Sequence, residues 1–105
     1  MTKISSDTSC QTVITTFETS PGTCADLIDE LQAAYDGVIR HQPGFISAAI
    51  HVNDAHTRIA NYSQWQRRED FQAMLRTEDM RVINRRLAAL CRAFEPVMYD
   101  VQRVI

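Results

Sequence analysis

A long amphipathic segment between two Pro-Gly pairs, at residues 21–22 and 43–44, constrains the fold of this chain more than any other feature. Its apolar residues recur at steps of three and four, the spacing of one face of an α-helix. They are Cys24, Leu27, Ile28, Leu31, Tyr35, Val38 and Ile39. Thr23 can cap the segment, and Asp26 lies in its first turn. The pattern predicts a helix that packs one face against the rest of the domain.

Strand-like segments lie on both sides of this predicted helix. From Thr12 to Thr19 the chain sets Val, Ile and Phe among threonines, a β-branched composition typical of strands. Residues 45–52 and 57–65 are two further runs of this kind, and the polar residues 53–56 between them predict a hairpin. Apolar and polar residues then alternate from Val97 to Val104, which predicts a last strand.

Two more helices are expected between the hairpin and the last strand. Phe71, Met74 and Leu75 mark a short helix, and the polar residues 77–79 separate it from a longer one that Pro96 ends. The longer helix is marked by Met80, Ile83, Leu87, Leu90 and Phe94. The order is βαββαβ, which predicts an α+β, ferredoxin-like fold with an antiparallel sheet. This domain is expected over residues 11–105, after a flexible N-terminal tail at 1–10.

The length, net charge and cysteine content of the chain exclude several functional classes. The chain has 105 residues, enough for one domain, and its formal net charge of -2 argues against a nucleic-acid partner. Three widely spaced cysteines indicate neither a disulfide framework nor a zinc site. No leader and no apolar run long enough to span a bilayer is evident, so we expect a cytoplasmic protein without membrane contact.

One face of the predicted sheet needs a cover, because both helices pack on the other face. The hairpin strand at 45–52 carries apolar side chains on both of its faces. On one face we expect Ile46, Ala48, Ile50 and Val52, and on the other Phe45, Ala49 and His51. In a chain of this size the available cover is a second copy, so the sequence predicts a homodimer with its sheets face to face.

The stretch from Asn61 to Trp65 carries the clearest chemical signal. Alternation along a strand places Asn61, Ser63 and Trp65 on one face. An amide and an indole N–H on an apolar wall can bind a flat, oxygen-bearing aromatic molecule. The alternative is that Asn61 ends a strand and Trp65 fills the core. Small residues at Ser47 and Ala49 either leave room for a ligand or allow close helix packing.

These motifs support a resemblance to a known family. Residues 43–48 (PGFISA), His51 at the end of that strand and residues 61–65 (NYSQW) occur in one order. In these features the chain resembles the antibiotic biosynthesis monooxygenase family, whose members are dimeric α+β barrels. Within the family it is most similar to small cofactor-free enzymes that oxidise tricyclic aromatic polyketides. The likeness extends over roughly residues 11–105.

The resemblance implies a set of site residues. Asn61 and Trp65 would hold the substrate oxygens, His51 would lie at the pocket, and Arg85 would approach the same cleft. The polyketide enzymes carry a tyrosine six residues after the tryptophan, whereas this chain has Phe71, a ring without a hydroxyl. We expect Phe71 to be a pocket wall, and Ser47, Ala49 and Ser63 to contribute to substrate binding. No histidine follows His56, which argues against the haem-degrading branch.

The residues also indicate how oxygen would be activated. The 3 glycines are isolated, so no glycine-rich phosphate loop for flavin or nicotinamide is present in the sequence. An iron site from His51, His56 and Asp54 is disfavoured, because a turn is a poor rigid scaffold. We therefore expect no metal and no cofactor. An electron-rich phenol can instead give an electron to O2 itself once it is deprotonated.

The sequence thus predicts a cofactor-free monooxygenase. Its substrates would be O2 and an aromatic polyketide, or a quinol or anthrone-type phenol, which it would oxidise to a quinone. Two alternatives remain open at this point. One is a polyketide cyclase or isomerase that uses His51 as a base, and the other is a non-catalytic dimer that binds an aromatic ligand.

Overall fold

The computed structural model describes residues 10–105, so most of the expected tail at 1–10 lies outside the described residues. A four-stranded antiparallel sheet and three α-helices make up the domain, with a short 3-10 helix, η1, after the first α-helix. The elements are β1 (Gln11–Glu18), α1 (Pro21–Gly37), η1 (Ile39–His41), β2 (Phe45–Val52), β3 (Arg58–Trp65), α2 (Arg68–Leu75), α3 (Glu78–Ala89) and β4 (Ala93–Tyr99).

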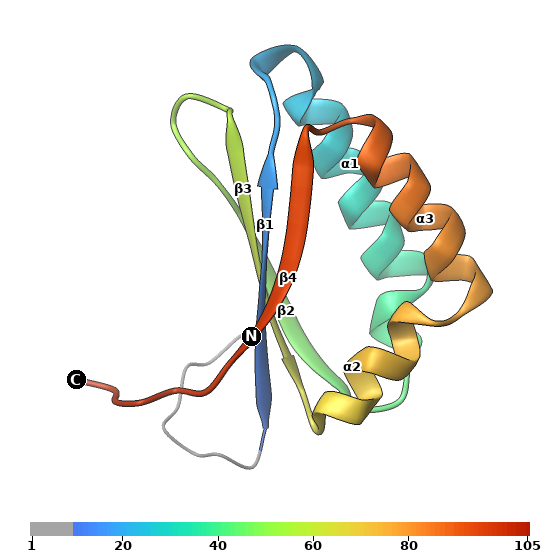
Figure 1. Ribbon diagram of the computed structural model, residues 1–105, viewed down its shortest axis with the longest axis vertical. Helices are drawn as coiled ribbons and strands as arrows, with labels where there is room; N and C mark the ends of the chain where they lie inside the picture. Colours follow the sequence, from blue (N-terminus) through green and yellow to red (C-terminus); the bar gives the residue numbers. More distant parts are fainter. Residues whose placement is uncertain (1–9) are drawn as a thin grey trace.

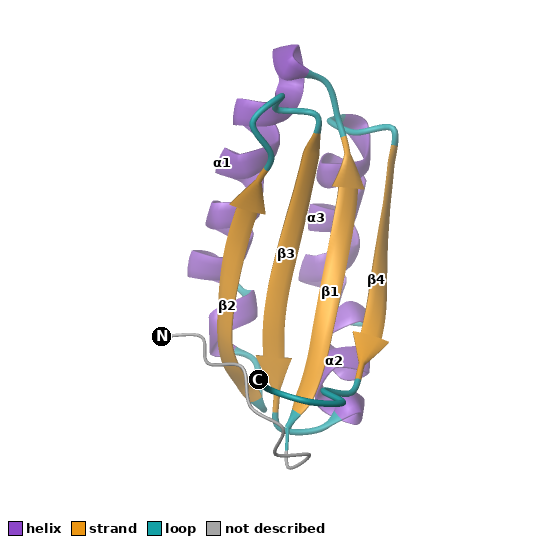
Figure 2. Ribbon diagram, turned by 90° about the vertical axis from the view of Figure 1, so that its left-hand side faces the viewer, coloured by secondary structure: helices purple, strands orange, loops and turns teal. Residues whose placement is uncertain are grey.

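The domain has two layers. The strands lie in the order β2-β3-β1-β4, and all three helices cover one face of the sheet (Figure 1). From the other side the strands are seen uncovered, with the helices behind them (Figure 2). The predicted ferredoxin-like α+β fold is confirmed. Below, the two sides of the sheet are called the helix face and the open face.

The first helix begins three residues earlier than the sequence indicated, because its cap was expected at Thr23. Its N-cap is Ser20 and Pro21 lies in its first turn, where a missing N–H costs nothing. Thr23 is therefore inside the helix and does not cap it. At the start of α3 a threonine does act as a cap, because the Thr77 hydroxyl accepts the backbone N–H of Met80 at 3.2 Å.

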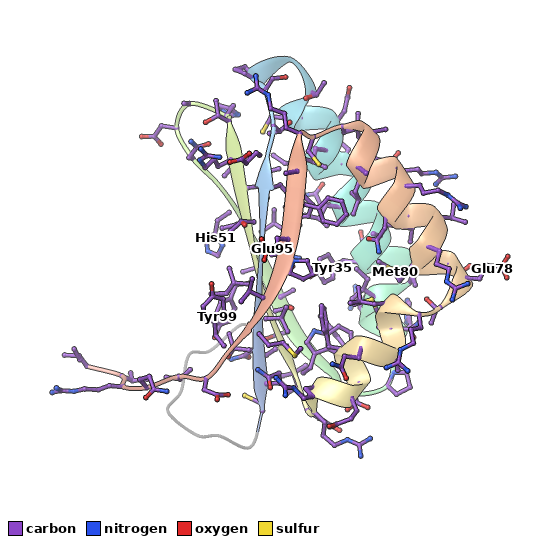
Figure 3. The ribbon with its side chains drawn as sticks, in the orientation of Figure 1. Tyr35, His51, Glu78, Met80, Glu95 and Tyr99 are labelled. Atoms are coloured by element: carbon purple, nitrogen blue, oxygen red, sulfur yellow. The ribbon has the colours of Figure 1, made fainter. Side chains whose placement is uncertain are left out.

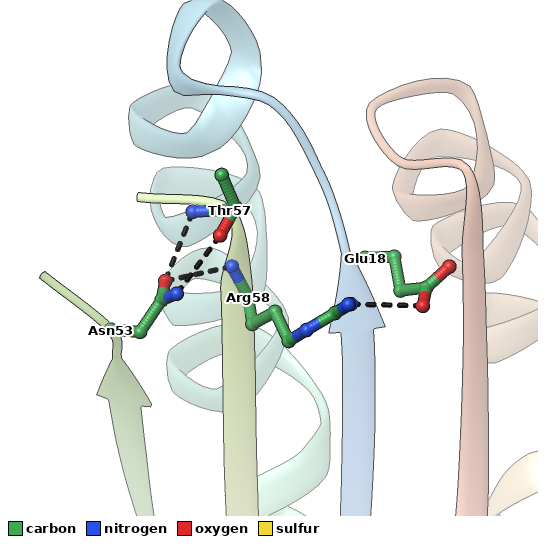
Figure 4. Close-up of polar contacts among 4 residues, drawn as sticks. All are labelled: Glu18, Asn53, Thr57 and Arg58. Atoms are coloured by element: carbon green, nitrogen blue, oxygen red, sulfur yellow. Dashed lines mark hydrogen bonds and ion pairs between the residues drawn. The ribbon is translucent and has the colours of Figure 1, made fainter. Parts of the chain in front are cut away.

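The predicted hairpin forms between β2 and β3, and its turn is closed by one side chain (Figure 4). The Asn53 Oδ1 atom accepts the backbone N–H groups of Thr57 and Arg58 at 2.9 and 2.8 Å. Its amide nitrogen donates to the Thr57 hydroxyl at 2.9 Å. Arg58 also pairs with Glu18 on β1, which joins the neighbouring strand at the same end of the sheet.

The C-terminal boundaries differ from the sequence prediction. The longer helix ends at Ala89, well before Phe94, and Pro96 lies inside β4 instead of stopping a helix. Proline is accommodated because β4 is at the edge of the sheet and pairs only with β1. Phe94 packs on the core through its ring, stacked 5.2 Å from that of Phe17. The strand stops at Tyr99, so residues 101–104 are not part of it.

An irregularity at the start of β2 changes which residues share a face. Phe45 pairs with Trp65, but the next pair is Ser47 with Gln64, so the register shifts at Ile46. Such a bulge breaks simple alternation along a strand. Phe45 is therefore on the same face as Ala48, Ile50 and Val52, contrary to the expected grouping, and this is the helix face.

The core fills the space between the helix face and the helices. Its most deeply buried side chains come from β1, β3 and α1 and are Val13, Phe17, Cys24, Leu27, Ile59 and Trp65. In the part of the chain that the structure describes, no helix combines the length and the apolar character needed to cross a membrane.

Candidate functional site

A cavity of about 50 Å³ lies within this core, between the helix face of the sheet and the three helices. Apolar and aromatic side chains make up most of its wall. Five polar residues interrupt that wall, and they are Thr15, Tyr35, Asn61, Ser63 and Asn84. An apolar cavity with a few convergent polar groups is the usual form of a small-molecule site.

Asn61 is the central polar residue of the cavity. It lies in the middle of β3, between Thr15 on β1 and Ile50 on β2, and only 6% of its surface is exposed. Its amide nitrogen donates to the Tyr35 hydroxyl at 2.6 Å. The Oδ1 atom is buried and has no hydrogen-bond partner among residues 10–105. An unpaired buried acceptor costs about 1–3 kcal/mol, which makes it a candidate ligand contact.

Tyr35 reaches the cavity from α1, and Figure 3 shows its side chain between that helix and the sheet. Burial raises the pKa of the Tyr35 phenol above its usual value of 10.0. Hydrogen bonds with Asn61 and Ser63 offset part of that rise in pKa. The phenol is thus neutral at neutral pH, and it can donate a hydrogen bond.

Trp65 and Ser63 form a buried pair on the helix face. The indole N–H of Trp65 donates to the Ser63 hydroxyl at 3.2 Å, and that hydroxyl lies 3.4 Å from the Val13 carbonyl oxygen. The sequence predicted that Asn61 and Trp65 would present two free donors to a ligand. In this structure both donor nitrogens have a partner within the protein, and the buried side-chain atom without one is an acceptor, Asn61 Oδ1.

Aromatic rings enclose the indole. Phe71 on α2 meets Trp65 edge to face, with ring centroids 5.7 Å apart, and Phe45 contacts another side of Trp65 at 5.4 Å. Such edge contacts are favourable for aromatic pairs and hold the rings in fixed orientations. Phe71 lines the cavity as a wall, as expected from the sequence.

Three of the expected site residues lie on the open face, away from the cavity. His51 pairs with Ala60, is exposed, and places its Nδ1 atom 3.2 Å from the Ala60 carbonyl oxygen (Figure 3). Ser47 donates to the side chain of Gln64 at 2.9 Å, and Ala49 pairs with Tyr62. The physical reason is that the apolar side chains of β2, such as Ile50, pack toward the helices. The alternate residues of the strand therefore point to the open face.

Arg85 is also outside the cavity. It is exposed on α3, whereas the preceding residue, Asn84, lines the wall. Met80 and Leu87 are buried, and Asn84 lies four residues after the first and three before the second. Helical spacing therefore places Asn84 on the same side of α3 as these two core residues.

The described residues do not assemble a metal site. Among residues 10–105 no group of three or more His, Cys, Asp or Glu side chains converges. This includes His51, Asp54 and His56, the set weighed above as an iron site.

Three polar residues of the wall, Tyr35, Asn84 and Thr15, were not among the site residues expected from the sequence. Each of them occupies an apolar periodic position, and in Tyr35 and Asn84 the polar atom is carried by a helix face that otherwise packs into the core. A polar residue in such a position must find a partner or a ligand. That signal was present in the sequence for Tyr35, which lies four residues after Leu31.

The chain resembles proteins of known type over most of its length. Residues 11–86 match the family model for antibiotic biosynthesis monooxygenases. The chain is 35% identical over 74 residues to tetracenomycin-F1 monooxygenase of Streptomyces glaucescens, a match that covers 70% of this chain. The match spans 66% of that relative, slightly less than two thirds of its length.

Two solved structures have the same fold at low sequence identity. SnoaB, a cofactor-independent oxygenase from Streptomyces nogalater, superposes with a TM-score of 0.74 at 17% identity, covering 92% of this chain and 97% of that one. A monooxygenase from the ActVA-Orf6 gene of Streptomyces coelicolor, solved with nanaomycin D, gives a TM-score of 0.75 at 22% identity, covering 92% and 90%. With a family model matched over most of its domain, the chain belongs to the antibiotic biosynthesis monooxygenase family.

Proposed function

We propose that this protein is a cofactor-independent monooxygenase that oxidises an aromatic polyketide, or a quinol or anthrone-type phenol, to a quinone with O2. The observation that carries the proposal is the buried, unpartnered Oδ1 atom of Asn61 in an aromatic-lined cavity. Membership of the family and the likeness to tetracenomycin-F1 monooxygenase support the same reaction class. Three unpaired cysteines are compatible with a reducing, cytoplasmic location.

The reaction needs no outside reductant. A phenol that has lost its proton can pass one electron to O2, and the resulting radicals combine into a ring peroxide. Loss of water from that peroxide leaves the quinone, so one oxygen atom enters the product and the other leaves in water. The chain's contribution is to orient the ring, with Asn61 Oδ1 accepting the O–H of the neutral substrate before that proton passes to solvent, and to exclude water with the Trp65 and Phe71 walls.

Substrate binding requires the cavity to enlarge. Its volume of about 50 Å³ is much smaller than the roughly 300 Å³ at the lower end of ligand sites. Part of its wall is Pro96 of β4, which is exposed, so the cavity lies near the surface along that edge of the sheet. A three-ring substrate would separate the helices from the sheet as it enters.

Oxygen uptake tests the proposal directly. Purified protein should consume O2 with a hydroxyanthrone or a dihydroxynaphthalene and release the quinone, one O2 for each quinone. Asn61→Ala should lower kcat/KM by roughly ten- to a hundredfold, which corresponds to the roughly 1–3 kcal/mol of one buried polar contact. Trp65→Phe should cost less, because the indole N–H already has a partner in Ser63.

The alternatives give different results in the same assay. A cyclase or isomerase would convert its substrate without O2 uptake, and its rate would depend on a base. A binding protein would turn over no substrate at all. His51, the base considered from sequence, lies across the sheet from the cavity, so no observation favours the cyclase. Either result with the wild-type protein would contradict the monooxygenase proposal.

A further inference from the structure

We infer that Tyr35 is a catalytic residue that donates its phenolic hydrogen to the reacting oxygen, while Asn61 accepts the hydroxyl of the same substrate. This inference rests on the proposed function and identifies the ligand class more narrowly, as an aromatic molecule with a free phenolic hydroxyl. Together the two side chains would offer one acceptor and one donor in the same wall of the cavity.

The direction of the hydrogen bond with Asn61 leaves the Tyr35 proton unused in that contact. Asn61 donates to the Tyr35 oxygen at 2.6 Å, so the phenol acts as the acceptor in this contact. A tyrosine hydroxyl can accept and donate at the same time. The same hydrogen bond turns the other amide atom, Asn61 Oδ1, into the position without a partner. The group that can donate to a ligand, the Tyr35 hydroxyl, and the atom that can accept from it, Asn61 Oδ1, are therefore adjacent.

No other phenol is available in the cavity wall that the structure describes. Phe71, where the similar polyketide enzymes carry a tyrosine, has a ring without a hydroxyl, and Tyr62 faces away from the cavity. Tyr35 also lines a surface groove of about 730 Å³ between α1 and β2. A residue that borders both spaces can take up protons from solvent on one side and deliver them on the other.

With Tyr35 as the proton donor, the oxidation of the phenol by O2 is balanced in protons and electrons. Attack of O2 on the ring gives a peroxide anion, to whose outer oxygen Tyr35 gives its proton, becoming a tyrosinate. The tyrosinate then removes the ring hydrogen as the O–O bond breaks, which forms the quinone carbonyl and releases hydroxide. Hydroxide takes up one proton from solvent, which balances the proton that the phenol released to solvent at the start. The sum is phenol plus O2 to quinone plus water, and Tyr35 is regenerated.

The first test compares two Tyr→Phe variants that each delete one hydroxyl. Tyr35→Phe should lower kcat by about a hundredfold, within the range for a general acid, with a smaller change in KM. The matched control is Tyr62→Phe on the open face, which should keep the wild-type kcat. Adding Phe71→Tyr to Tyr35→Phe returns a hydroxyl to the cavity from α2 and should restore part of the lost rate. An unchanged kcat in Tyr35→Phe would overturn the inference.

A second test uses binding, so it stands even where no turnover is seen. Quenching of Trp65 fluorescence should report tighter binding of 2-naphthol than of its methyl ether, which cannot donate to Asn61. This preference should shrink in both Tyr35→Phe and Asn61→Ala. Absence of O2 uptake by the wild type would contradict the proposed oxidation alone. Equal binding of the naphthol and the ether by the wild type would contradict the assignment of Tyr35 and Asn61.

Discussion

Hydrogen bonds on the helix face satisfy two separate pairs of polar side chains and leave one buried atom unpaired. Trp65 donates to Ser63 on the same strand, and Asn61 donates to Tyr35 across the gap to α1. Most of these donors and acceptors satisfy one another, so their burial costs little. The remaining cost is concentrated at Asn61 Oδ1, where a ligand hydroxyl would relieve it.

The raised pKa of Tyr35 predicts a loss of stability in alkali. Below the unfolded-state pKa, close to the usual 10.0, the phenol is neutral in both the folded and the unfolded chain. In that range it does not make the free energy of unfolding depend on pH. Above that value the unfolded chain loses its proton while folded Tyr35 keeps it, so the free energy of unfolding falls as the pH rises toward the folded pKa. Burial, which disfavours the phenolate, is the cause of the shift.

Urea unfolding at about pH 9 and at about pH 11 would measure this loss. Tyr35→Phe removes the titrating group, so its free energy of unfolding should fall less between the two pH values than that of the wild type. Its stability at the lower pH will also differ, because the contact with Asn61 is gone, so the comparison concerns only the change with pH. Equal changes in the two proteins would show that Tyr35 titrates normally.

The sequence predicted which side chains of β3 share a face. It did not predict which side chains of β2 and α3 point toward the cavity. Alternation correctly placed Asn61, Ser63 and Trp65 on one face, because β3 is regular throughout. His51 was expected at the pocket, but the register of β2 with β3 places it on the open face. Short-range periodicity does not reveal which of two mixed faces turns inward. That choice depends on how well the whole apolar set packs.

The elements are positioned by a few specific junctions, of which Gly44 is the most restricted. Its φ of 83° lies in the left-handed region, and a Cβ there would overlap the side chain of Asp70 at the start of α2. The Gly44 carbonyl also accepts the backbone N–H of Gln66 at 2.7 Å. The turn before β2 is therefore packed directly against the segment between β3 and α2.

Gly44→Ala should destabilise the fold by about 2 kcal/mol, because it combines a strained backbone with an overlap. Gly22→Ala is a matched control, since a Cβ at Gly22, in the first turn of α1, would meet no atom within 4 Å. The control should be neutral or slightly stabilising, as alanine favours a helix. Urea unfolding of both variants decides the matter, and a loss of equal size at the two glycines would contradict the role of the Gly44 junction.

Element types were easier to predict than element ends. The helices and strands follow from periodicity, but the sequence extended the last helix to Phe94 and began the last strand after Pro96. Phe94 fits the apolar spacing of α3, yet it packs from β4 against Phe17. Only the tertiary contact separates these possibilities. Pro96 is tolerated in a strand because it lies at an edge, which the local sequence does not show.

At the scale of the whole molecule, the open face is the feature that a single chain leaves incomplete. Ile14 and Val97 are only half-buried there, and Tyr99 is 48% exposed. The C-terminal residues after β4 run to this side of the sheet, as Figure 1 shows, and end in the exposed Val104 and Ile105. An uncovered sheet face with apolar side chains is typical of a surface that meets another protein. A second copy presents the same surface and can cover it symmetrically.

We therefore predict a homodimer with its open faces in contact, with an interface above roughly 1,200 Å² in total. Ile14→Asp would place a charge at the centre of this interface and should convert the protein to a monomer at micromolar concentration, as measured by sedimentation. Val82→Asp is the control, because Val82 is 37% exposed on α3, on the opposite side of the molecule. The control should stay dimeric. A wild-type monomer with full activity, or a dimer that Val82→Asp dissociates and Ile14→Asp does not, would exclude the open face as the interface.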